Sequence, residues 1–276
     1  MSTLTLTAPS TTRPRYRLST KGVLHAEWTK FWSLRSSWIT LAVSLFLLVA
    51  FGVIAAITYD PAITTAEGPP GQQAASDAVG VILTGATFAS LAIGVLGVLM
   101  SAGEYTTGSI RSTLAAIPSR LPVLWSKATV FGAIALVATT IGAFAAFALG
   151  NPQLNGQDIA LSLTDDGVVR SLLGAGLYLG LVGILGVALG ALLRSSAGAI
   201  TVLAGVLLIV PGLTSLLPDS WSDTISPYLP SNAGSAVMSL TQSSDSLGPW
   251  TGLAVFAGWV AIALAAAAYR LVRSDA

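Results

Sequence analysis

The sequence contains no cysteine and only one histidine, His25, among its 276 residues. Disulfides, thiolate metal sites, iron–sulfur clusters and cysteine nucleophiles are therefore excluded, and one histidine cannot supply the paired imidazoles of a haem. Charge is also scarce, because only 9% of the residues are charged where roughly 25% is typical of soluble domains. A soluble domain with so few charges would expose apolar surface and aggregate. The composition predicts an all-α polytopic membrane protein embedded in the lipid bilayer. Its net charge of only +1 argues against a nucleic-acid partner.

The few charges leave six long apolar segments between them. Each can hold the roughly 20 apolar residues that cross about 30 Å of hydrocarbon as a helix. We predict six transmembrane helices, at about 38–59, 78–100, 128–150, 171–193, 198–217 and 250–269. They form one transmembrane domain over 19–276, and the Ser-, Thr-, Pro- and Arg-rich tail 1–18 is expected to be disordered.

The basic residues predict the orientation of these helices. Twelve of the 13 Lys and Arg side chains fall on one side of the predicted membrane, and only Arg170 falls on the other, with nine of the 12 acids. Loops rich in Lys and Arg remain in the cytoplasm, so both termini and the 101–127 loop are predicted to be cytoplasmic. Ten Arg against three Lys, with heavy use of Ala and Gly, suggests a GC-rich bacterial genome and therefore a bacterial plasma membrane.

The predicted spans contain no Asp, Glu, Lys, Arg or His. Ion-coupled transport, intramembrane proteolysis and haem-based electron transfer need such groups within the membrane. The segment GEYTTGS at 103–109 has two glycines five apart like a phosphate-binding loop, but Ser109 replaces the lysine and no strand precedes it. ATP, if used, must be bound by another chain. The alternative is an ATP-independent channel or scaffold.

Two stretches on the positive side have amphipathic character. In 20–36, the residues Leu24, Trp28, Phe31 and Arg35 follow one helical face. Thr20 is expected to cap this helix, and Glu27 and Lys30 to pair at i, i+3 on its polar side. Such a helix is expected to lie among lipid headgroups, or simply to anchor the first span.

The 101–127 loop is expected to hold a short coupling helix over 107–117. Thr107 can cap it, and Ile110, Leu114 and Ile117 share one face. At 27 residues the loop exceeds the 2–8 residues usual between antiparallel helices. This length favours a surface for a cytoplasmic partner over a plain connector.

Three segments resemble a known family when taken together. They are HAEWTKFWSLRSSW (25–38), GEYTTGSIRSTLAAIPSRLPVLWSKA (103–128) and LPDSWSDTISPYLPSNAG (217–234). In this order on a six-span chain they resemble bacterial type-2 ABC transporter permeases, especially the EWTK-type subgroup. The resemblance implies an exporter in which two six-helix subunits, identical or different, pair above two ATPase subunits. ATP and Mg would be bound by the ATPase, and this chain would hold no cofactor and catalyse no reaction.

The resemblance also implies which residues contact the ATPase. In the family the N-terminal amphipathic helix and the loop after span two couple the subunits. The matching residues here are Glu27, Lys30, Glu104, Gly108, Arg111 and Arg120. Short helices dipping into the membrane from outside are expected at 221–229 and 232–240, with Ser231 as a cap.

Spans four and five carry helix-packing signals. Five of six glycines in span four lie within one arc of the helix, which favours tight static packing, or else a face that slides during transport. Pro211, preceded by Gly205, is expected to kink span five or unwind its outer end. In related exporters spans one, two and five line the passage for a hydrophobic or amphipathic drug, lipid or peptide. Residues assigned to that passage are Thr84, Thr87, Phe88, Ser90 and Thr201. The alternative is that each hydroxyl bonds its own backbone.

Overall fold

The computed structural model describes residues 19–60, 77–110, 113, 120–214, 216, 218–241 and 246–273. Over these residues the chain is helical and contains no strand. The long helices are α1 (Thr20–Ser33), α2 (Arg35–Ile57), α4 (Ala86–Thr107), α6 (Leu121–Gly150), α7 (Val168–Leu193) and α12 (Pro249–Arg273). The shorter ones are α3 (Ala78–Ile82), η1 (Leu83–Gly85), η2 (Asn151–Leu154), α8 (Ser196–Ala204), η3 (Gly205–Ile209), α9 (Val210–Thr214), α10 (Asp219–Ile225), η4 (Ser226–Tyr228), α11 (Pro230–Ser235) and η5 (Ala236–Met238).

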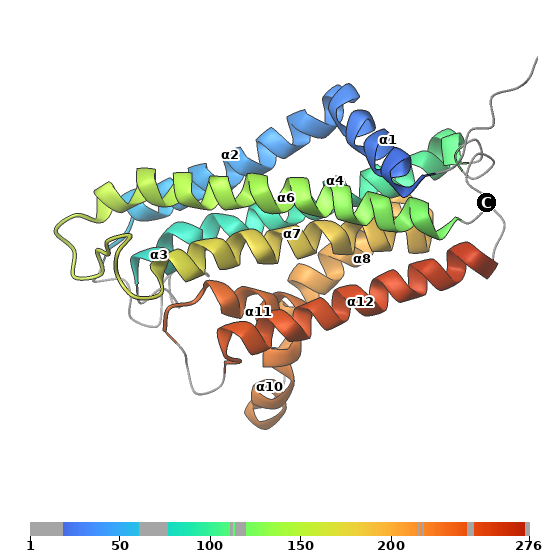
Figure 1. Ribbon diagram of the computed structural model, residues 1–276. Helices are drawn as coiled ribbons and strands as arrows, with labels where there is room; N and C mark the ends of the chain where they lie inside the picture. Colours follow the sequence, from blue (N-terminus) through green and yellow to red (C-terminus); the bar gives the residue numbers. More distant parts are fainter. Residues whose placement is uncertain are drawn as a thin grey trace, which may run out of the picture.

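Within the described residues, six helical segments are long and apolar enough to cross a membrane. They are Arg35–Ile57, Ala78–Thr107, Leu121–Leu154, Val168–Leu193, Ser196–Thr214 and Pro249–Arg273. The predicted number of spans is therefore confirmed. Because α12 ends at the same end of the molecule at which α1 lies (Figure 1), the chain crosses the bundle an even number of times.

The helices extend further than the charges suggested. α4 continues to Thr107 and α6 already begins at Leu121, so Glu104 and Lys127 are helical. These two ionisable residues lie in the same helices as the second and third predicted spans, but beyond the bounds predicted for those spans. Thr107 does not cap a new helix, because it is the last residue of α4, which Gly108 closes with a left-handed φ of 73°.

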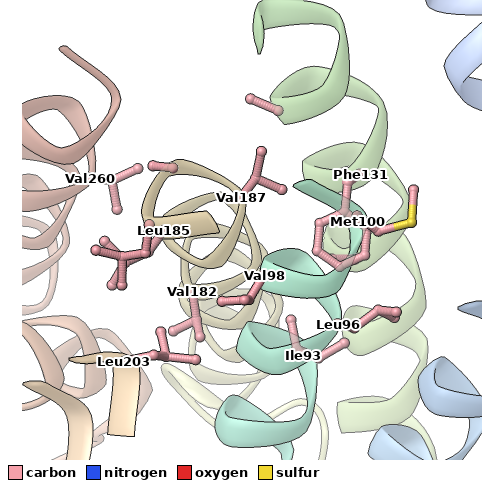
Figure 2. Packing of buried hydrophobic residues seen from close by; sticks show 14 of the residues in the cluster. Ile93, Leu96, Val98, Met100, Phe131, Val182, Leu185, Val187, Leu203 and Val260 are labelled. Carbon is pink, nitrogen blue, oxygen red and sulfur yellow. The ribbon is translucent and has the colours of Figure 1, made fainter. Parts of the chain in front are cut away.

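Helix α7 occupies the centre of the bundle. Figure 2 shows its residues Val182, Leu185 and Val187 between α4 and α6 on one side and Leu203 and Val260 on the other. In its most apolar stretch 78% of residues are buried, more than in any other candidate span described. The glycines make this possible, because a Cβ on Gly186 would collide with the backbone of α4 and a Cβ on Gly176 with α6. The glycine stripe therefore packs tightly within the subunit, and both expectations for it, a static contact or a sliding one, stay predictions.

Span five is interrupted where Pro211 was expected to disturb it. α8 passes into a five-residue π-helical turn, Gly205–Ile209, before α9 resumes. Proline has no N–H to donate and its ring crowds the carbonyl four residues earlier, here that of Leu207 within the π-helical turn. The backbone hydrogen bonds therefore change from the i→i−4 pattern of an α-helix to the i→i−5 pattern of a π-helical turn.

Between the fifth and sixth spans the chain forms a series of short helices. α10 and η4 cover most of the predicted 221–229 stretch, and α11 and η5 cover most of 232–240. Ser231 is not the cap, since Leu229 occupies that position and Pro230 begins α11. α11 lies against α12 (Figure 1), where Gly252 allows close approach to the carbonyl of Ala233.

Candidate functional site

A cluster of buried charges joins three helices at the α1 end of the bundle. Lys127 of α6 donates to Oε2 of Glu27 on α1 at 2.9 Å and to Oε1 of Glu104 on α4 at 2.8 Å. Lys30 of α1 also pairs with Oε1 of Glu104. The ammonium group of Lys127 thereby contacts Glu27, which lies 100 residues earlier in the sequence, and Glu104, which lies 23 residues earlier.

The cluster is enclosed by protein. Exposed side-chain fractions are 4% for Lys127, 8% for Glu27 and 5% for Glu104, and only Lys30, at 34%, reaches the surface. Charges removed from water are tolerated when they are paired and hydrogen-bonded. Two ammonium groups and two carboxylates balance here, so the cluster has no net charge. Breaking one pair would leave a charge buried without compensation.

Helix α1 turns a face that contains a charged residue toward the bundle. Its buried residues are Val23, Glu27 and Phe31, which follow one another at i, i+4, whereas Leu24 and Trp28 are exposed. Phe31 is fully buried and its ring lies 6.3 Å from that of Phe131 on α6. The expected local pair of Glu27 and Lys30 is therefore wrong, because each side chain finds its partner on another helix.

The boundaries of α1 also differ from expectation. Thr20 is the first helical residue and Ser19, not Thr20, occupies the cap position without a side-chain hydrogen bond. The helix ends at Ser33, since Leu34 is extended, and Arg35 belongs to α2. The predicted apolar face through Arg35 therefore spans two helices.

Gly108 and Arg120, which were also assigned to the ATPase contact, lie at the same end but outside the cluster. Gly108 is exposed in its left-handed turn. Arg120 is the N-cap residue of α6, with a φ of 46°, and donates to the carbonyl of Leu271 on α12 at 3.2 Å. Arg111, Ser119 and most of the predicted 107–117 helix lie outside the described residues, although Ser109, Ile110 and Thr113 are helical. The partner contact of all six assigned residues stays a prediction.

Further interactions connect α4, α7 and α12 at this end. The guanidinium of Arg194, which ends α7, lies 5.3 Å from the ring centroid of Tyr105 on α4. Arg270 of α12 donates to the carbonyl of Leu192 on α7. Sequence reasoning missed Tyr105, Lys127 and Arg270 as members of a connected layer. One signal in the sequence could have indicated Lys127 and Arg270. Charged residues are scarce in this chain, and a charged residue next to an apolar span needs a partner.

The residues assigned to a substrate path do not gather in one cavity. Thr84, Ser90 and Thr201 each donate to a carbonyl three or four residues earlier in their own helix, as the alternative explanation expected. Thr87 and Phe88 are exposed, and the ring of Phe88 stacks on Phe51 of α2 with centroids 4.0 Å apart. Ser90 is buried. The assignment of these five residues to a substrate path stays a prediction.

The described residues contain no group of three or more His, Asp or Glu side chains that could hold a metal ion. The buried cluster consists of two lysines and two glutamates that connect α1, α4 and α6. Six spanning helices, with a cross-linked polar layer at one end, define a multi-pass membrane protein.

The particular family follows from comparison of the sequence. The model of a family described as ABC-2 family transporter protein matches residues 23–276, so the chain belongs to that family. It is accordingly a membrane permease component of an ABC transporter, a class that works with an ABC ATPase partner. Among curated proteins, none matches the chain.

Proposed function

We propose that the chain is the permease subunit of an ATP-driven exporter in a bacterial plasma membrane, of the EWTK-type subgroup. Two permease subunits, identical or different, pair and receive two ATPase subunits at the α1 end. ATP and Mg belong to the ATPase, and this chain contributes no nucleotide site. Family membership and the resemblance of the segments at 25–38, 103–128 and 217–234 support this assignment.

The buried charge cluster carries the mechanistic part of the proposal. It attaches α1 to α4 and α6 through Lys127, and the loop between α4 and α6 is the segment expected to meet the ATPase. A movement of that loop would therefore be transmitted through these ion pairs to α1 and to the start of α2. Because Glu27 and Glu104 are buried, their role is to position the coupling elements, while Gly108, Arg111 and Arg120 remain the residues proposed to face the ATPase.

The proposed cargo is a small hydrophobic or amphipathic molecule such as a drug, lipid or peptide. Exposed Thr87 and Phe88 on α4 and Thr201 on α8 would face it once a second subunit closes the passage. The competing function is an ATP-independent channel or scaffold, which would work without an ATPase.

Co-purification and reconstitution test the proposal. The chain is expressed with the ATPase encoded beside its gene, and ATP hydrolysis is measured for each protein alone and together in liposomes. We expect no hydrolysis by the permease alone, and stimulation of the ATPase when both are present. Arg111→Ala should abolish stimulation while membrane insertion persists, whereas Asp158→Asn at the opposite end should leave it unchanged. Failure of any neighbouring ATPase to bind the chain would favour the channel or scaffold.

A further inference from the structure

A polar pocket lies between the short helices that follow span five and the residues just before α12. Its volume is about 260 Å³. The polar residues of its lining are Ser222, Asp223, Ser226, Asn232 and Ser246. Figure 1 shows α10, which contributes two of them, at the flank of the bundle near α11 and α12 and away from the end at which α3 lies. A polar surface is therefore present on the flank of a membrane protein.

The segment that forms one wall of the pocket lies at the depth of the spanning helices. Nε1 of Trp259, the eleventh residue of α12, donates to the carbonyl of Tyr228 at 3.0 Å. A Cβ on Gly234 of α11 would collide with the ring of Tyr178, the eleventh residue of α7. At 1.5 Å per residue, both contacts are about 15 Å from the first residues of these two spans. The segment 226–234 is therefore beside residues that cross the membrane.

Asp223 gives this pocket a negative charge. Its side chain is exposed, and within the described part of the chain it forms no ion pair. Arg170, at the same end of the bundle, donates to the carbonyls of Val237 and Ser239 instead. A carboxylate at membrane depth is costly unless it faces a water-filled cavity or pairs with a cation. The charge of Asp223 therefore favours a cationic ligand in the pocket.

The groups beside Asp223 are arranged to accept hydrogen bonds. Nδ2 of Asn232 donates to the carbonyl and to Oγ of Ser226, at 2.9 and 2.8 Å. These two bonds turn the amide nitrogen toward Ser226 and leave Oδ1 of Asn232 as an acceptor. The pocket thus combines a carboxylate, an amide oxygen and the hydroxyl of Ser222. A primary ammonium group, with three N–H donors and no acceptor, matches this set.

We infer that this pocket binds the primary ammonium head group of an amphipathic cargo, in the half of the membrane away from α1. The ammonium donates to Asp223, Asn232 and Ser222. The carbon chain of the cargo contacts Pro227 and Leu247, the apolar part of the lining. A quaternary ammonium group has the charge but no N–H to donate, and an alcohol lacks the charge. The inference rests on the proposed export of an amphipathic molecule and narrows that molecule to an amine.

Binding of tritiated octylammonium to the purified full chain tests the site, measured by scintillation proximity in a non-ionic detergent. Octyltrimethylammonium and octanol should compete at least about tenfold more weakly than unlabelled octylammonium, because each lacks a charge-assisted hydrogen bond to the carboxylate. Asp223→Asn, an isosteric change at an exposed position, should weaken binding at least about tenfold. Asp158→Asn, at another exposed acid of the same end, should leave binding unchanged.

Ser222→Val keeps the charge of Asp223 but removes one acceptor, and should also weaken octylammonium binding. Full binding by Asp223→Asn, or octanol competing as well as octylammonium, would overturn the site. Full binding by Ser222→Val would overturn the acceptor set, and competition by millimolar Ca²⁺ as strong as by octylammonium would assign the pocket to a metal ion instead of an amine. Neither ATP nor an ATPase is present in this assay. Its failure therefore leaves the exporter proposal standing with a different cargo, whereas failure of the ATPase to bind the chain is observed separately.

Discussion

At the scale of single residues, Lys127 decides how the α1 end is held together. Its ammonium group contacts carboxylates from two other helices at 2.8 and 2.9 Å, and its side chain is 4% exposed. A methionine has similar length but no charge, so it would fill the space, leave Glu27 without its ion-pair partner and leave Glu104 paired with Lys30 alone. Removing one partner of a buried ion pair is strongly destabilising because the remaining charge is uncompensated.

Lys127→Met should therefore lower the free energy of unfolding by about 3–5 kcal/mol, measured by denaturant unfolding in detergent. The double variant Glu27→Gln/Lys127→Met should recover much of this loss, because the charges of Lys30 and Glu104 then balance. Lys21→Met, on an exposed part of α1, should change stability by no more than about 0.5 kcal/mol. A double variant as unstable as the single one would contradict the charge-balance explanation.

The sequence predicted three of the four charges in this cluster but not how they pair. Glu27, Lys30 and Glu104 were assigned to the partner contact. Lys127 was assigned to the preceding loop, because the predicted spans were drawn between charged residues and the third therefore begins at 128. Helical spacing favoured a local pair of Glu27 and Lys30. Burial of the Val23–Glu27–Phe31 face turns these side chains toward other helices, and which face is buried depends on tertiary packing that spacing does not contain.

At the scale of elements, the glycines of α7 determine how closely its neighbours approach. Gly186 faces the backbone carbonyl of Gly94, so an added Cβ would force α4 and α7 apart. Gly258 on α12 offers a matched contrast, because nothing lies within 4 Å of a Cβ built there. The same substitution therefore has opposite consequences at the two positions.

Gly186→Ala should destabilise the protein by about 1–3 kcal/mol, the usual cost of overpacking. Gly258→Ala should be neutral or stabilising by up to about 1 kcal/mol, because alanine favours a helix over glycine. Thermal unfolding of both variants in the same detergent checks this contrast. An equal loss at both positions would mean that helix α12 is packed more tightly than the isolated subunit shows.

Helices were predicted well where the sequence pattern that indicates them extends over many residues, and less well where the helix is short. Six apolar runs, the glycine stripe and the disturbance near Pro211 follow from the sequence because each involves many residues or a strong backbone constraint. The short helices between spans five and six were placed with the wrong cap. Pro230 occupies the first helical position, so the N-cap is Leu229 and not the hydroxyl-bearing Ser231.

At the scale of the whole molecule, the two ends of the bundle differ in charge. The α1 end carries the cluster around Lys127 together with Arg120, Arg194 and Arg270. Arg170 lies at the opposite end, where its guanidinium donates to the carbonyls of Val237 and Ser239. Under the positive-inside rule this distribution predicts that the α1 end is cytoplasmic.

Cysteine labelling can test this orientation without interference, because the chain has no cysteine of its own. Gln153, at the end of the bundle away from α1, and Lys21, on α1, are both exposed. In intact cells an impermeant maleimide should label Gln153→Cys and spare Lys21→Cys, which should react only after the membrane is permeabilised. Both variants must insert normally, which flotation with membranes verifies. Labelling of Lys21→Cys alone in intact cells would invert the orientation, and would move the ATPase contact to the loops beside Arg170.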